Sequence, residues 1–271
     1  MFTKSLLLAL LTLWPAAPAG AVDARALRRA LIAELRRDPG DDIGRATAEF
    51  LETSTTTLRV APTHPDKRDG VSACAEYERG RGLITIDDRF VASAQGARGP
   101  RLLARRLAPT IVHEVEHARA DTAVPGAPLM REGEFCAYAA EAAFLRRRLA
   151  SDPEYAGLAE VDERAPRSHP RGRPSRWWLD PLPPGDPVAL VAPADAQRTR
   201  TNYWLVVRAS AGGLGALERL LLDKKWVDLP DAKKACSPAL DDARRRACGR
   251  SAERYRRRLT ELGALLPSPN R

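Results

Sequence analysis

The spacing of apolar residues in the first part of the chain predicts a mixture of helices and short strands. Apolar side chains recur at helical spacing over residues 23–37, and a second helical pattern covers 42–52. Alternating β-branched residues predict a strand at 55–60, and the run at 83–87 predicts another. Between these strands, the Pro-, Asp- and Gly-containing stretch 62–82 is typical of a loop.

Helical patterns dominate the rest of the chain. Helices are predicted at residues 88–95, 101–108, 110–118, 132–145, 195–222 and 237–262. Pro109 is expected to open or kink the third of these, and Gly212-Gly213 to interrupt the fifth. The fold class expected from these patterns is α+β and mostly helical.

The N-terminal segment has the features of an export signal. Lys4 precedes a short apolar run at residues 6–14, and Ala19-Gly20-Ala21 is a small-x-small cleavage site. We therefore expect a signal peptide at 1–21 and a mature protein that is periplasmic or secreted. The apolar run is too short to span a bilayer, and no later run is long enough, so no transmembrane segment is predicted in the mature chain.

The remaining chain divides by composition into three parts. We expect a metal-binding core at 22–150, a connection rich in Pro and Arg at 151–195, and a helical region at 196–271. The formal net charge of the 271 residues is +9, and arginine supplies most of the positive charge. Because the basic runs at 146–148, 244–246 and 256–258 lie in helical patterns without interleaved aromatic residues, they are interpreted as solvated helix faces, and nucleic-acid binding is not expected.

A candidate metal site lies in the helical pattern at 110–118. His113, Glu114 and His117 form the motif H-E-x-x-H, which accounts for two of the chain's 4 histidines. Residues four apart are neighbours on a helix, so His113 and His117 can bind one ion. Glu114 is rotated by roughly 100° from His113, which allows it to reach a water on that ion without being a ligand.

A catalytic zinc needs a third protein ligand, and the next predicted helix offers several. Glu134, Tyr138 and Glu141 fall on one side of an otherwise apolar helix. The sixteen residues between His117 and Glu134 allow the chain to turn back and pack this helix against the first. Glu134 is therefore the first choice for the third ligand, with Glu141 and Glu132 as alternatives.

Four cysteines in an exported chain indicate two disulfides. The favoured pairs are Cys74 with Cys136 and Cys236 with Cys248. Ser237 is expected to cap the last helix, so Cys236 must fold back from that cap to reach Cys248.

Residues 83–145 resemble the core of the zincin metallopeptidases, and in particular the gluzincins, which combine an H-E-x-x-H helix with a glutamate on the next helix. The resemblance covers about a quarter of the chain and rests on His113, Glu114, His117 and Glu134. It implies an edge strand at 83–87 for extended substrate, one catalytic Zn²⁺, and a protein or peptide substrate. The longer metzincin signature fits poorly, because Ala123 stands where its third ligand would be.

The expected function is an exported zinc-dependent metallopeptidase in which Glu114 is the general base. Tyr138, Tyr203 and His169 are candidates for a second donor to the oxyanion. The alternative is a non-catalytic exported domain that binds zinc or a partner through its helices.

Overall fold

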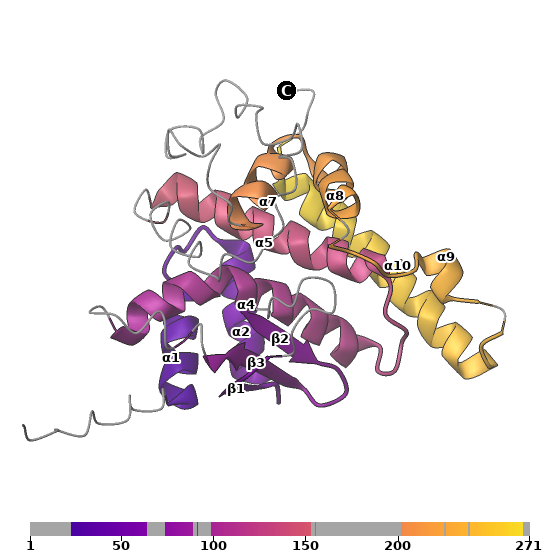
Figure 1. The fold of residues 1–271 in the computed structure, drawn as a ribbon, viewed down its shortest axis with the longest axis horizontal. Coiled ribbons are helices and arrows are strands. Elements are labelled where there is room, and N and C mark those ends of the chain that lie inside the picture. The colour runs from indigo at the N-terminus through magenta and orange to yellow at the C-terminus, as the bar shows by residue number, and fades with distance from the viewer. Residues whose placement is uncertain are drawn as a thin grey trace, which may run out of the picture.

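The computed structural model describes residues 23–63, 74–88, 91, 99–152, 155, 202–224, 226–237 and 239–267. Within these ranges the chain has eight helices and three strands, so the prediction of a mostly helical α+β fold is confirmed (Figure 1). The predicted signal peptide, most of the helix predicted at 88–95 and nearly all of the Pro/Arg-rich connection lie outside the described residues. No helix in the described part is both long enough and apolar enough to cross a membrane.

Two short helices form the N-terminal part of the described chain. Helix α1 (Ala24–Leu35) and helix α2 (Asp42–Thr53) agree with the predicted ranges. Asp23 and Asp41 are their N-caps, and each side chain accepts a hydrogen bond from a backbone amide of its helix. The apolar faces of both helices are buried, and both helices contact the helix that carries the histidines.

A three-stranded sheet lies beside these helices, with strand β3 (Leu83–Asp87) in its centre. Strand β1 (Thr57–Ala61) pairs with β3 in parallel, and strand β2 (Ala75–Glu78) pairs with β3 antiparallel. The prediction of β3 as an edge strand is therefore wrong, because both of its edges are paired; β2 and β1 are the edge strands. The prediction of a loop throughout 62–82 is also wrong at β2, whose apolar–polar alternation covers only four residues and is therefore too short to indicate a strand in the sequence.

Helix α4 (Gly99–Ala123) is the long helix that carries the histidines, and it continues through Pro109. The sequence predicted separate helical segments on either side of this proline. Proline has no amide hydrogen, so the carbonyl of Arg105, four residues earlier, lacks its helical donor. The hydroxyl of the buried Tyr155 donates to this carbonyl at 2.6 Å and takes the place of the missing amide.

This replacement can be tested by a double-mutant cycle. We expect Tyr155→Phe to lower the free energy of unfolding by about 1–2 kcal/mol, because it removes the donor to a carbonyl inside the fold. In a Pro109→Ala background the helix regains an amide donor, so the same substitution should cost less. Chemical denaturation of the four proteins measures the coupling. Equal costs of Tyr155→Phe in both backgrounds would show that the hydroxyl does not replace the missing amide.

Helix α5 (Arg131–Ser151) is buried along nearly its whole length. Its alanine-rich sequence allows close packing on several sides, and α4, α10 and α7 all contact it. Figure 1 shows α4 between the sheet and α5, with the C-terminal helices on the far side of α5. The two helices that were expected to hold the metal are therefore packed against each other in the middle of the fold.

The C-terminal region is helical, as predicted. Helices α7 (Asn202–Ala211) and α8 (Leu214–Asp223) are separated at Gly213, whose positive φ of 79° favours glycine. The short helix α9 (Ala232–Ala235) is followed by the long helix α10 (Asp242–Leu265). The cap of α10 is Asp241, so the helix begins five residues after the predicted range, which started at 237.

The later start of α10 places Cys236 outside that helix, at the C-cap of α9. Cys236 and Cys248 form a disulfide with a Cα–Cα distance of 5.5 Å, so this predicted pair is confirmed. The pair Cys74–Cys136 is wrong. Cys74 adjoins the sheet, whereas the Cys136 thiol points to α10 and donates to the Tyr255 carbonyl at 3.6 Å. Helix α4 lies between the sheet and α5, so the two thiols do not meet.

The three arginine runs differ in their environment. Arg244, Arg245 and Arg246 are exposed, as predicted for a solvated helix face, and in the run at 256–258 Arg256 and Arg257 are exposed while Arg258 is half-buried. The run at 146–148 was predicted to be solvated as well, but Arg146 and Arg148 are buried. Each has partners on another element: Arg146 donates to the Val207 carbonyl, and Arg148 to carbonyls at the end of α1.

Candidate metal centre

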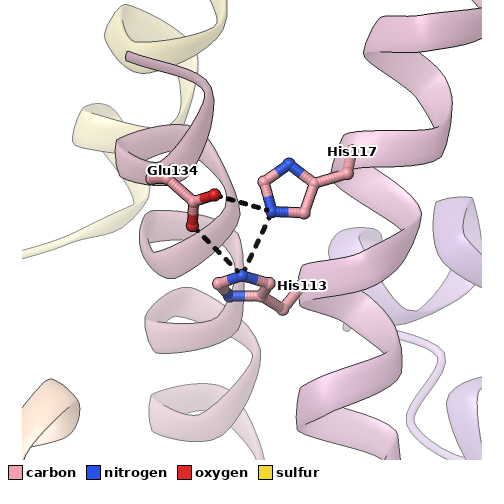
Figure 2. Close-up of side chains that lie close together, drawn as sticks. All are labelled: His113, His117 and Glu134. Carbon is pink, nitrogen blue, oxygen red and sulfur yellow. Dashed lines mark hydrogen bonds and ion pairs between the residues drawn. The ribbon is translucent and has the colours of Figure 1, made fainter. Parts of the chain in front are cut away.

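Helices α4 and α5 bring His113, His117 and Glu134 to one point. The two histidines lie one turn apart on α4, and Glu134 lies in the first turn of α5, after the chain has reversed direction. Figure 2 shows both imidazoles pointing from one helix towards the carboxylate on the other. The opposite face of α4 carries Ile111 and Val115, which are fully buried.

The spacing of the ligand atoms fits a small divalent cation. Nε2 of His113 and Nε2 of His117 are 3.2 Å apart. The Glu134 carboxylate oxygens lie 3.6 Å from the first nitrogen and 3.5 Å from the second. Donors bound at 2.0–2.1 Å to a tetrahedral zinc are about 3.3–3.4 Å apart. Within the described chain, these three residues form a group whose donor atoms all lie within 4.8 Å of one another.

The charges of the three residues support one another. Burial opposes the charge on Glu134, but His117 and His113 offset it and hold the pKa of this carboxyl well below its usual range. Burial also opposes a charge on His113, yet Glu134 and Glu141 raise its pKa well above the usual value. A site with two imidazoles and one carboxylate suits zinc, although the same donors also bind other first-row metals.

The two alternative third ligands have other roles. Oε2 of Glu141 lies 3.2 Å from Nδ1 of His113, on the side of the ring that faces away from the cluster. A carboxylate in this position fixes the tautomer and the orientation of a metal-binding histidine. Glu132 accepts a hydrogen bond from the Ala232 amide at the start of α9, so it does not point at the histidines. Of the three glutamates considered, the structure places Glu134 among the donor atoms.

The role of Glu141 can be tested by its removal. We expect Glu141→Gln to weaken zinc binding about 10-fold or more, because the amide is a poorer acceptor for the Nδ1 proton of His113. Glu132→Gln is the matched control, since it makes the same change on the same helix away from the histidines. Competition with a chelator of known zinc affinity measures both. Equal affinities for the two variants would contradict the orienting role.

Glu114 lies beside the cluster and is not one of its donors. Its side chain is 8% exposed, and burial raises the pKa of the carboxyl while the two histidines partly offset this. Oε2 accepts a hydrogen bond of 2.8 Å from the backbone amide of Tyr77 in edge strand β2. This bond fixes the carboxylate beside the two histidines and ties the sheet to α4.

The β2–β3 hairpin is attached to α4 at a second point, Asp121. Oδ2 of Asp121 accepts hydrogen bonds from the Tyr77 hydroxyl at 3.0 Å and from the Gly80 amide at 2.8 Å, and Arg79 forms an ion pair with its other oxygen. These contacts align β2 with the helix over about two turns, from Glu114 to Asp121. This part of the site was not predicted, because its contacts use backbone amides and a strand of only four residues.

Aromatic residues enclose the other side of the cluster. The Tyr138 ring contacts the His113 ring edge to face, with centroids 4.5 Å apart, and stacks on Trp226. Of the three residues considered as oxyanion donors, Tyr138 is the one that the structure places beside the histidines. His169 lies outside the described residues, as does the side chain of Tyr203.

Comparison with known proteins gives no relative. No family model matches the chain, and no curated protein or solved structure matches it significantly. The resemblance to zincins therefore stays a prediction that depends on His113, Glu114, His117 and Glu134.

Proposed function

We propose that this protein is a zinc-dependent hydrolase that cleaves peptide bonds. The observation that carries the proposal is the combination of three converging donors, His113, His117 and Glu134, with a buried carboxylate, Glu114, that adjoins them without being a donor. Catalytic zinc sites have three protein ligands and one open position, and they need a nearby base.

The residues divide the chemistry between them. His113, His117 and Glu134 would hold the zinc, which when bound supplies an acidified water and a positive charge for the developing oxyanion. Oε2 of Glu114 is engaged by the Tyr77 amide, so Oε1 is the oxygen that would take a proton from the attacking water and give it to the leaving amine. Glu141 would keep the Nε2 of His113 directed at the site.

The arrangement of the sheet favours a peptide as the substrate. Strand β2 is an edge strand, and its Tyr77 amide points at Glu114 and away from β3. The Tyr77 amide is already bound to Glu114, so an extended peptide would add to this edge through the other main-chain groups of β2, which would bring its carbonyls close to Glu114. Strand β2 therefore takes the role that the sequence analysis gave to residues 83–87.

The competing reading is a non-catalytic domain with a structural zinc. Structural sites are usually closed by four Cys or His ligands. The described part of the chain provides two histidines and one glutamate at this point, and its two disulfide-bonded cysteines lie at α9 and α10. This donor set favours the catalytic reading.

The proposal is tested first on the unmodified protein. We expect about one zinc per chain by elemental analysis, and hydrolysis of an unfolded protein substrate that stops on chelation and returns when zinc is added. His113→Ala and His117→Ala should each lose the metal. If the double alanine variant retained zinc, the assignment of His113 and His117 as ligands would be wrong. Zinc bound at His113 and His117 without hydrolysis of any unfolded protein would instead favour the structural reading.

A further inference from the structure

A pocket of about 480 Å³ lies among α2, α4, α5 and α10, and His113, His117 and Glu134 do not line it. Its charged lining consists of four arginines and two glutamates: Arg119, Arg254, Arg257, Arg258, Glu116 and Glu261. A pocket of this volume is within the range of small-molecule sites and too small for a folded partner. Its charge indicates what it would bind.

Ion pairs within the pocket account for the two glutamates. Arg258 holds the buried Glu116 with two hydrogen bonds, from Nε at 3.1 Å and from Nη2 at 2.7 Å, and Arg119 adds a third at 3.0 Å. Nη1 of Arg258 also donates to Glu261 at 3.1 Å. Glu116 belongs to the helix turn that carries His117, so these bonds fix α10 against α4.

The other two arginines of the pocket do not belong to this network of ion pairs. Arg254 and Arg257 line the pocket, are exposed, and take part in none of the ion pairs of the described chain. They are three residues apart on α10, so their side chains lie on the same side of the helix. With four arginines against two glutamates, the pocket has an excess of two positive charges.

We infer that this pocket binds a small molecule with two closely spaced acidic groups, either phosphates or carboxylates. Each guanidinium presents a planar fork of donors that matches one such group. Tyr255 and Ala120 provide an apolar wall for the remainder of the ligand. This site is independent of the proposed hydrolase activity.

Inorganic pyrophosphate is a suitable probe, and calorimetry on the full mature protein measures its binding. Arg254→Gln and Arg257→Gln should each lower the affinity about 10-fold, because each removes a charge-assisted contact to one phosphate. Neither arginine takes part in the ion pairs of the described chain, so both variants should melt like the unmodified protein. Arg250→Gln is the matched control: it removes an exposed arginine from the same helix that does not line the pocket, and it should change the affinity by less than about 2-fold.

The experiment also distinguishes a soluble ligand from a lipid headgroup. Vesicles of cardiolipin, whose headgroup carries two phosphates, in phosphatidylcholine should retain the protein only if the natural ligand is a lipid, and Arg254→Gln and pyrophosphate should then both reduce retention. Binding of pyrophosphate without retention on vesicles would identify a soluble ligand. The inference is overturned if the protein binds neither probe, or if Arg250→Gln weakens binding as much as Arg254→Gln does.

Discussion

Replacing Glu114 by Gln is expected to reduce peptide hydrolysis by about 10²–10⁴-fold, the usual contribution of a general base. Glutamine has nearly the same volume as glutamate and keeps a carbonyl oxygen, so it can still accept the hydrogen bond from the Tyr77 amide. It cannot take a proton from the attacking water. The loss should therefore appear in kcat with zinc content and melting temperature close to those of the unmodified protein.

Glu134→Gln is the matched control for this experiment. It makes the same chemical change at a carboxylate that lies 3.5–3.6 Å from both histidine nitrogens. A neutral amide is a poor replacement for a charged ligand, so this variant should lose zinc affinity together with activity. Elemental analysis and a peptidase assay on both variants separate the base from the ligand. Full activity in Glu114→Gln would refute the hydrolase mechanism even if zinc were bound.

The helices and the site on α4 were largely predictable from the sequence, because both depend on local periodicity. Ile111 and Val115 on one face of α4 and His113 and His117 on the other follow from 3.6 residues per turn. The placement of Glu134 followed from the polar stripe on an otherwise apolar helix and from a loop long enough to reverse the chain. What the sequence left open was which of three glutamates would meet the histidines, and the structure places Glu134 there.

The errors concern contacts between segments that are distant in the sequence. Strand β2 alternates apolar and polar residues over only four positions, and what defines it is its pairing with β3 and the bond from Tyr77 to Glu114. The continuity of α4 through Pro109 depends on the hydroxyl of Tyr155, which lies 46 positions further along the chain. The prediction of a Cys74–Cys136 disulfide was wrong because the spacing of cysteines in the sequence does not indicate that helix α4 separates these two residues.

The wrong prediction with the largest energetic consequence is that of a solvated helix face at the arginine run 146–148. A run of three arginines in a helix is typical of a solvated face, but Arg148 is only 2% exposed. Its Nη2 donates to the carbonyls of Glu34 and Leu35 at the end of α1, at 2.8 and 3.0 Å. Its Nε lies 3.2 Å from the equally buried Asp41, whose other oxygen caps α2. One side chain of α5 thus stabilises the junction of α1 and α2.

Arg148→Met is expected to lower the free energy of unfolding by about 3–5 kcal/mol, because it leaves the buried charge of Asp41 without a partner. For a chain of this length the loss corresponds to a fall in Tm of roughly 6–20 °C. Methionine keeps the apolar stem against Phe144, so the change reports mainly on the charge. Arg147→Ala is the neighbouring control: that side chain is half exposed and pairs with Asp38, and its removal should cost less than about 1 kcal/mol.

Two further measurements assign the loss to Asp41. Asn is as good an N-cap as Asp, so Arg148→Met combined with Asp41→Asn should recover much of the stability by removing the unpaired charge while keeping the cap of α2. Burial already raises the pKa of Asp41, and loss of Arg148 raises it further. A carboxyl whose pKa is higher in the folded than in the unfolded protein binds its proton more tightly in the fold, so protonation at lower pH stabilises the folded state. The loss of unfolding free energy in Arg148→Met should therefore be smaller in mildly acidic than in alkaline buffer. A deficit that is independent of pH and unchanged by Asp41→Asn would show instead that the contacts to the end of α1 account for the loss.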